Sequence, residues 1–183
     1  FLQKASMSTD FTQDHFALFN LPRRFAVDTA LLDSAWRTAA AEVHPDRFVT
    51  APDAEKRVAL MRATRVNEAY QTLKSPVARA RYLLQLAGVD TAEETNTSMP
   101  AAFLMAQMEW RETIADARAV ANVDQLEALS RQLRGDVKGL EAELGSALDE
   151  QADHAAAALA VRKLRFLEKL DQEIGDAIEA LLY

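Results

Sequence analysis

The chain has 183 residues, of which 49 % are apolar, so it can bury a core and does not fall in the disordered class. It has no cysteine, which excludes disulfides and thiolate metal sites, and no apolar run approaches the about 20 residues that cross a bilayer. The net charge of −7 is uneven: residues 1–90 have 12 Lys and Arg against 10 Asp and Glu, and residues 91–183 have 9 against 18. These balances of +2 and −9 predict two parts with different roles. The acidic part argues against nucleic acid as a partner, because phosphate binding needs clustered cations.

Strong helix formers dominate the chain, and only 5 Gly and 5 Pro interrupt them, which predicts an all-α fold. The pair Met7 and Ser8 is typical of a natural start. We therefore expect residues 1–9 to be a flexible N-terminus that includes residues foreign to the natural chain. The first residues are too few and too polar to be a signal peptide.

The helical pattern is interrupted once over a long stretch, at "LAGVDTAEETNTSMP". This stretch contains Gly88, a polar run and Pro100, all of which are typical of a connection. The interruption divides the chain into a first module at 10–87, a linker at 88–99 and a second module at 100–183.

In the first module, a short helix or turn at 12–22 precedes a longer helix that begins at Asp28, a good N-cap residue. This longer helix is predicted to end near Val43, because the residue before a proline is pushed out of the α region. Its apolar residues recur at helical spacing: Leu32, Trp36, Ala39 and Val43.

A third helix of the first module is predicted to be capped by Asp53. Its expected inward-facing residues are Val58, Met61, Val66, Ala69, Tyr70 and Leu73. A fourth helix follows "KSP" and is closed by Gly88.

The loop between the two long helices contains His44, Pro45 and Asp46. Pro45 could simply end a helix, and Asp46 could be an ordinary turn residue. The residue types also suit a docking loop, because proline lowers the cost of ordering, and the imidazole and carboxylate offer hydrogen bonds and a partner for arginine. No metal site is expected at His44, because the other histidines, His15 and His154, lie in other helices.

The position of His-Pro-Asp between two helices, with "TRVNEAYQTLKSP" in the second, resembles the J-domain of DnaJ-type co-chaperones. The residues that match the third-helix pattern of that family are Asn67, Ala69, Tyr70 and Leu73. The resemblance implies that residues 10–87 form a J-domain, an antiparallel helical hairpin with flanking short helices. It also implies binding to a DnaK-type chaperone, whose ATPase the J-domain stimulates by allosteric coupling.

The chain departs from the usual J-domain in the charge of its second helix, which offers only Arg37, with Arg47 just after the tripeptide. Three arginines of the third helix could share the contact with the chaperone: Arg57, Arg62 and Arg65. The departure predicts weak electrostatic steering toward the chaperone rather than a loss of binding.

The second module is predicted to be an antiparallel three-helix bundle, with helices at about 100–120, 124–148 and 151–182. At about 100° per residue, the first helix has one core stripe, made of Phe103, Ala106, Trp110, Ile114 and Ala117. A second apolar cluster lies on the opposite face around Glu112, with Glu109 at its edge: Leu104, Met105 and Met108. This cluster is either buried against the first module or an exposed docking patch, for which adaptable methionines rimmed by charge are suited.

Four stretches outside the tripeptide, "DHFALFNLP", "SPVARARYLLQLAG", "AAFLMAQMEWRE" and "VRKLRFLEKL", resemble HscB, the co-chaperone family of iron–sulfur cluster assembly. The resemblance runs from about Asp14 to Leu182. It implies that the second module binds the IscU-type scaffold protein and that the chaperone partner is of the HscA type. The scaffold-binding positions that it implies are Leu104, Met105, Met108, Glu109, Glu112 and Phe166. The pattern of the last helix puts Phe166 at the margin of the core, so the sequence leaves its exposure open.

These observations predict a cytoplasmic co-chaperone that delivers an IscU-type scaffold to an HscA/DnaK-type chaperone and stimulates the ATPase of that chaperone. No cofactor, membrane or nucleic-acid partner is expected. An enzyme is not expected either, since no nucleophile–base set or phosphate-binding glycine loop is present. Two alternatives stay open: a J-domain co-chaperone with another client, and a helical adaptor with an incidental His-Pro-Asp.

Overall fold

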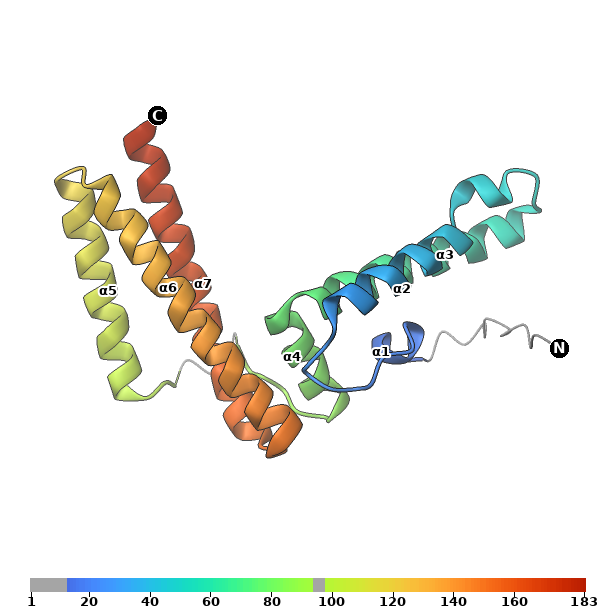
Figure 1. The fold of residues 1–183 in the computed structure, drawn as a ribbon, viewed down its shortest axis with the longest axis horizontal. Coiled ribbons are helices and arrows are strands. Elements are labelled where there is room, and N and C mark those ends of the chain that lie inside the picture. Colours follow the sequence, from blue (N-terminus) through green and yellow to red (C-terminus); the bar gives the residue numbers. More distant parts are fainter. Residues whose placement is uncertain (1–12, 94–97) are drawn as a thin grey trace. The chain divides into compact units, whose positions relative to one another are not determined.

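A computed structural model describes residues 13–93 and 98–183, and every regular element in those two stretches is helical (Figure 1). The predicted all-α fold is confirmed. Residues 1–9 and part of the predicted linker, residues 94–97, lie outside the described residues. By packing, the chain divides into a unit that ends at Ser75 and a unit that starts at Pro76, which we call the N-terminal and C-terminal units. Neither unit has a helix that is both long and apolar enough to span a membrane, as far as the chain is described.

The N-terminal unit is built on a pair of long helices, α2 (Thr29–Glu42) and α3 (Asp53–Lys74), joined through the short 3₁₀ helix η1 (Pro45–Phe48). The helix α1 (His15–Leu18) packs against α3. As predicted, Asp28 caps α2, since its carboxylate accepts from the N–H groups of Ala30 and Leu31. The core of the unit is mainly aromatic and aliphatic: Phe16, Phe19, Phe25, Leu32, Val43, Ala59, Val66, Ala69, Tyr70 and Leu73.

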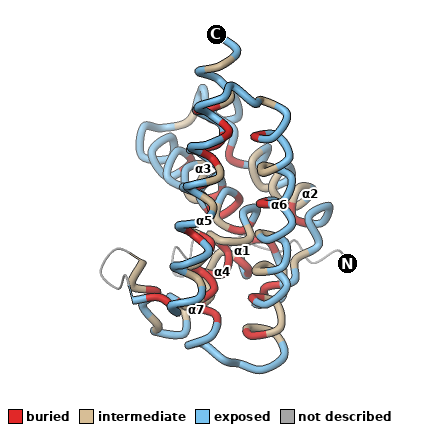
Figure 2. The backbone as a smooth tube through the Cα atoms, turned by 90° about the vertical axis from the view of Figure 1, so that its left-hand side faces the viewer, coloured by how far each residue is buried: buried red, intermediate tan, exposed pale blue. Residues whose placement is uncertain are grey.

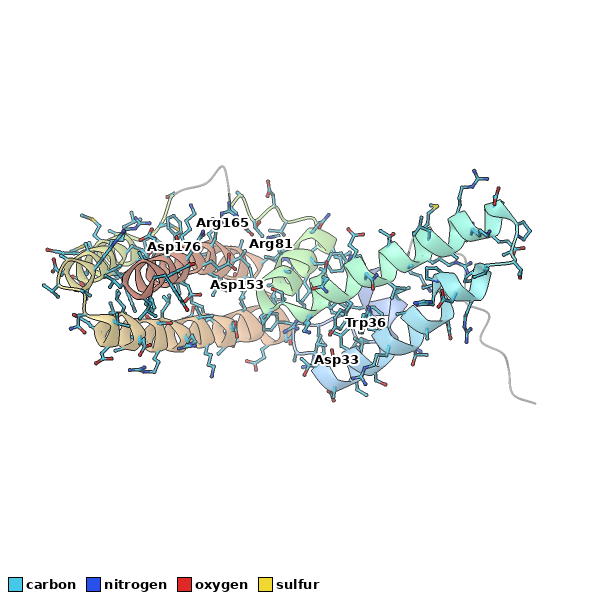
Figure 3. All side chains as sticks on the ribbon, turned by 90° about the horizontal axis from the view of Figure 1, so that it is seen from above. Asp33, Trp36, Arg81, Asp153, Arg165 and Asp176 are labelled. Carbon is cyan, nitrogen blue, oxygen red and sulfur yellow. The ribbon has the colours of Figure 1, made fainter. Side chains whose placement is uncertain are left out.

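Four side chains fix the register of α2 against α3, and we call them the α2–α3 cluster: Asp33, Trp36, Asn67 and Tyr70. The rings of Trp36 and Tyr70 stack with centroids 4.5 Å apart. The indole of Trp36 donates to Oδ1 of Asn67 at 3.0 Å, and the Tyr70 hydroxyl donates to Oδ1 of Asp33 at 2.7 Å. Figure 3 shows Trp36 and Asp33 along α2 beside α3. Each of these polar groups is paired with a side chain on the facing helix, so a shift of one helix along the other would break both hydrogen bonds together.

The start of α3 differs from the sequence prediction. Pro52 precedes the helix without a side-chain cap, and Asp53 is its first residue and not its cap. Val58 and Met61, which the periodicity turned inward, are 37 % and 57 % exposed, and Ala59 is buried in their place. The reason is helix length: α3 has 22 residues and α2 has 14, so the first turns of α3 have only η1 beside them.

The C-terminal unit contains α4 (Pro76–Leu86), α5 (Ala101–Ala119), α6 (Val123–Gly145) and α7 (His154–Leu182). A π-helical turn, η2 (Ser146–Glu150), ends α6. The bundle predicted for the second module is present as α5, α6 and α7, and the pairing of α6 with α7 is its most extensive contact. Buried and exposed positions alternate along these helices (Figure 2), as the amphipathic pattern requires.

The helix α4 packs on α7 and α6, and this contact groups it with the C-terminal unit. The sequence places α4 in the first module instead. The packing boundary therefore lies ahead of the linker expected at 88–99, and the module boundaries stay predictions. The end of α4 follows expectation, because Gly88 has a φ of +75°, which glycine adopts without strain.

The beginning of the linker stretch is held in place by Glu93, whose side chain is 8 % exposed. The guanidinium of Arg81 on α4 donates to both carboxylate oxygens, at 2.7 and 2.9 Å, and Arg165 on α7 lies 3.8 Å away (Figure 3). The hydrogen bond to Glu93 raises the pKa of Arg81, so the pair stays charged. This network anchors residues 88–93 to α4 and α7.

Candidate protein-docking surfaces

The first candidate surface is the turn formed by His44, Pro45 and Asp46, which we call the His-Pro-Asp turn. Val43 is buried and ends α2, and Pro45 begins η1, where its missing N–H costs nothing. The Nδ1 atom of His44 accepts from the backbone N–H of Asp46 at 3.3 Å and lies 3.6 Å from Oδ2 of Asp46. The side chains of His44 and Asp46 are 60 % and 88 % exposed. The turn is thus locally organised and open to a partner, and it is a capped helical turn rather than the loop that the sequence predicts.

The arginines expected to assist this turn lie in different environments. Arg37 on α2 and Arg47 in η1 are exposed, and within the described residues neither forms an ion pair. Arg57 is exposed as well. Arg65, in contrast, donates to the backbone carbonyl of Gln13, so it holds the N-terminal segment onto α3. Of the arginines expected to assist the turn, Arg37, Arg47 and Arg57 are therefore exposed, whereas Arg65 is engaged elsewhere. Their role in chaperone binding stays a prediction.

Periodicity alone misses an apolar hollow beside the turn. It has a volume of about 370 Å³ and is lined by Phe48, Ala54, Glu55, Val58, Ala59 and Arg62. Nearby on the chain, Val49, Leu60 and Met61 are more than half exposed. The mismatch in length between α2 and α3 could have signalled this hollow, because the uncovered start of α3 is the part that lines it.

The second candidate surface is the exposed face of α5, which we call the α5 patch and define by Leu104, Met105, Met108, Glu109 and Glu112. The three apolar side chains are 41 %, 63 % and 70 % exposed, and both glutamates are exposed as well. Within the C-terminal unit, α6 and α7 leave this face uncovered, and its role as a docking patch stays a prediction. Large apolar side chains next to charges are typical of partner sites.

The core face of α5 follows the prediction at four of its five positions and differs at one. Ile114 and Ala117 are buried, and Phe103 and Trp110 are partly buried against the bundle core. Ala106 is exposed, and Gln107 is 4 % exposed in its place. The buried arc of α5 therefore includes Gln107, on the same side of the helix as Arg111, which reaches Glu173 of α7.

The exposure of Phe166 on α7, which the sequence left open, is intermediate. Its ring meets that of Phe103 edge-on, with centroids 6.0 Å apart. The ammonium groups of Lys169 and Lys163 lie 5.7 Å from the Phe166 and Phe103 ring centres, respectively. Because Phe103 precedes Leu104, the aromatic pair joins Phe166 to the edge of the α5 patch.

The described residues include no group of three His, Cys, Asp or Glu side chains that could hold a metal ion. The side chains of His44 and Asp46 face solvent. Both surfaces are suited to binding proteins.

Comparison with known proteins gives similarity over nearly the whole chain. The family model described as the HSCB C-terminal oligomerisation domain matches residues 99–175. A co-chaperone protein HscB homolog of Chromobacterium violaceum is 71 % identical over 176 residues, which cover 96 % of this chain and 99 % of that protein. A second HscB homolog, from an Azoarcus strain, is 53 % identical over 175 residues, again covering 96 % and 99 %.

Solved structures give the same result. The chaperone HscB from Vibrio cholerae matches with a TM-score of 0.81 and 36 % identity, over 92 % of this chain and 99 % of that one. The human co-chaperone protein HscB matches with a TM-score of 0.84 and 32 % identity, over 91 % and 82 %. Both of these similar structures are described as HscB.

Proposed function

Because the chain belongs to the HscB family of co-chaperones, we propose that it brings an IscU-type iron–sulfur scaffold protein to an HscA/DnaK-type chaperone. In this proposal the C-terminal unit binds the scaffold and the N-terminal unit binds the chaperone and stimulates its ATPase. The observation that carries the proposal is that one chain exposes both a His-Pro-Asp turn and an apolar helix face.

The geometry of the His-Pro-Asp turn supports the chaperone half of the proposal. The carboxylate of Asp46 is 88 % exposed, which leaves it available for a bidentate pair with an arginine of the chaperone. Pro45 and the bond between His44 and the Asp46 N–H restrict the turn before binding, so less conformational entropy is lost on docking. Arg37 precedes the turn in the chain and Arg47 follows it, and their exposed positive charges would steer an approaching chaperone.

The α5 patch supports the scaffold half. Burial of Leu104, Met105 and Met108 removes apolar surface from water, at roughly 25 cal/mol per Å². Phe166 adds an aromatic edge that the pair with Phe103 holds in position. Glu109 and Glu112 at the rim give direction and specificity, and they contribute less to affinity.

The protein itself performs no chemistry in this scheme. Stimulation of the chaperone is an allosteric effect, since docking at one surface changes the chaperone's hydrolysis at another. The iron–sulfur cluster travels as cargo on the scaffold, and this chain needs no resident cofactor.

The proposal is tested by measuring the chaperone's ATPase with and without the scaffold. The variant His44→Gln should lose at least about tenfold of the stimulation under both conditions, while its affinity for the scaffold stays unchanged. The double variant Leu104→Ala with Met105→Ala should keep the scaffold-independent stimulation and lose the extra stimulation that the scaffold gives.

Each half can fail separately. Full stimulation by His44→Gln would remove the chaperone half. Undiminished scaffold binding by the double alanine variant would remove the scaffold half. Stimulation without any binding of the scaffold would favour a co-chaperone with a different client.

A further inference from the structure

The α5 patch continues along the helix beyond the residues that define it. Leu104, Met108, Arg111, Ala115 and Arg118 follow one another at steps of four, three, four and three residues, so they form one continuous stripe. All five side chains are exposed. The stripe changes along its length from apolar to basic.

The helix α7 runs beside this stripe in the same direction as α5. Phe103 meets Phe166, and two turns further on the guanidinium of Arg111 lies 3.5 Å from the carboxylate of Glu173. Figure 3 labels Asp176 on the same part of α7, next to α5. The seam between the two helices thus begins at the α5 patch and leads away from it.

Beyond Arg111 the seam widens into a groove of about 680 Å³. Its lining residues are Arg111, Ile114, Ala115, Arg118, Ala119, Glu173, Asp176 and Ala177. Ile114 and Ala177 are buried and form an apolar floor, while the α5 wall carries two arginines and the α7 wall carries two carboxylates. Among the described residues, Arg118 and Asp176 form no ion pair, so both remain available to a ligand.

We propose that this groove binds an extended segment of the scaffold protein, continuous with the part of the scaffold that covers the α5 patch. This inference rests on the proposed function of that patch. An extended backbone presents both N–H and C=O groups along each of its edges, so a segment in the groove can accept from the arginines of α5 and donate to the carboxylates of α7. The small side chains of Ala115 and Ala119 let such a backbone approach the helix closely.

Gln107 lies between the two parts of this surface, one turn before Arg111 and one turn after Phe103. It is 4 % exposed, and its Oε1 atom has no hydrogen-bond partner among the described residues. A buried amide oxygen without a partner is uncommon in a folded protein. The Oε1 atom of Gln107 is therefore an unused hydrogen-bond acceptor at the seam, where the scaffold segment would pass from the α5 patch to the groove.

The test compares two variants that add the same side chain to two exposed helical alanines. Ala115→Arg fills the groove, and Ala128→Arg places the same bulk and charge on α6, which does not line it. Calorimetry with the purified IscU-type scaffold should show about tenfold weaker binding for Ala115→Arg and no change for Ala128→Arg. Both variants should unfold at the same temperature as the unaltered protein, since both positions are exposed.

Hydrogen exchange of the scaffold tests whether the bound segment is extended. Consecutive amides in one scaffold segment should gain protection in the complex and lose it again with Ala115→Arg. If the scaffold amides showed the same protection in complexes with the unaltered protein and with Ala115→Arg, the inference would be overturned.

The outcomes separate this inference from the proposed function. If Leu104→Ala weakens scaffold binding and Ala115→Arg does not, the groove inference is wrong and the patch stands. If neither variant changes binding, the proposed scaffold site itself fails. If Ala115→Arg changes only self-association, measured by sedimentation, the groove holds a second copy of this chain and the inference is overturned.

Discussion

The His-Pro-Asp turn and the α5 patch are both exposed, but they are built in different ways. The turn consists of three consecutive residues whose shape comes from the chain itself, through Pro45 and the bond between His44 and the Asp46 N–H. The patch consists of residues at helical spacing, and it is a surface only because α6 and α7 cover the other faces of α5. Local conformation therefore makes the first surface, and tertiary packing leaves the second one uncovered.

The difference extends to the forces that each surface offers. The turn presents hydrogen-bonding groups and a carboxylate, which give direction but must be desolvated on binding. The patch presents apolar side chains with several rotatable bonds, which adapt to a partner and gain free energy from the removal of water. Substitutions should therefore affect the two surfaces independently.

The largest effect is expected from a charge placed inside the patch. Met108 is 70 % exposed, and Met108→Glu would bury an unpaired carboxylate against the scaffold. Scaffold affinity should fall by about 3 kcal/mol, or roughly a hundredfold, because this desolvation has no compensating partner. Stimulation of the chaperone in the absence of scaffold should stay unchanged, which an ATPase assay checks.

The matched control for this prediction is Val120→Glu. Val120 is 73 % exposed and follows α5 directly, outside the patch. It should bind the scaffold like the unaltered protein in calorimetry. An equal loss of affinity in both variants would mean that overall charge, and not the apolar patch, controls binding.

A smaller effect is expected from the α2–α3 cluster of the N-terminal unit. Tyr70→Phe keeps the ring against Trp36 but removes the 2.7 Å bond to Asp33. The free energy of unfolding of this unit should fall by about 1.5–3 kcal/mol, the usual value for a hydrogen bond to a charged group. Trp36 and Trp110 lie in different units, so a Trp110→Phe background leaves Trp36 as the fluorescent reporter for denaturant titrations of this one.

The scaffold affinity of Tyr70→Phe should not change, since the patch lies in the other unit. An unfolding midpoint equal to that of the background protein would show that Tyr70 contributes by ring packing alone.

The two surfaces were not equally predictable from the sequence. The start of α2 follows from Asp28, and its end and the position of the turn follow from Pro45, because both residues act on their own neighbours. The second apolar face of α5 also follows from periodicity, but whether that face is exposed does not. The burial of Gln107 in place of Ala106 does not follow from periodicity, because it depends on where the neighbouring helices pack against α5.

The remaining differences have the same origin. The exposure of Val58 and Met61 depends on where α2 stops, and the half-burial of Phe166 depends on its contact with Phe103. The packing of α4 on α6 and α7 depends on contacts between residues far apart in the chain. A pattern within one helix identifies its apolar faces, but only the neighbouring helices decide which face is covered.

The smallest expected effect is a difference between the units in their response to acid. Burial in the contact of α1 with α3, and then the positive charge of Arg65, lower the pKa of His15 below its usual value of 6.5, although Glu68 and Asp14 act in the opposite direction. The unfolded chain therefore binds a proton more readily than the folded one, so stability is lost as the pH falls from about 6.5 through the folded pKa. In the C-terminal unit the single histidine, His154, is exposed at the start of α7.

Denaturant titrations at pH 7.5 and pH 5.5 should therefore show a loss of stability in the N-terminal unit, followed by Trp36 in the Trp110→Phe background. The reciprocal background, Trp36→Phe, follows the C-terminal unit through Trp110 and should show a smaller change. His15→Gln removes the titrating group, so the N-terminal unit of this variant should lose less stability over the same interval. Asp14, next to His15, does not titrate in this pH range. Burial by itself would raise the pKa of Asp14, but the hydrogen bonds from Arg23 and the Ala17 N–H bring that pKa below 3.8. If acid destabilised the His15→Gln variant as much as its parent, the response would belong to groups other than the half-buried imidazole of His15.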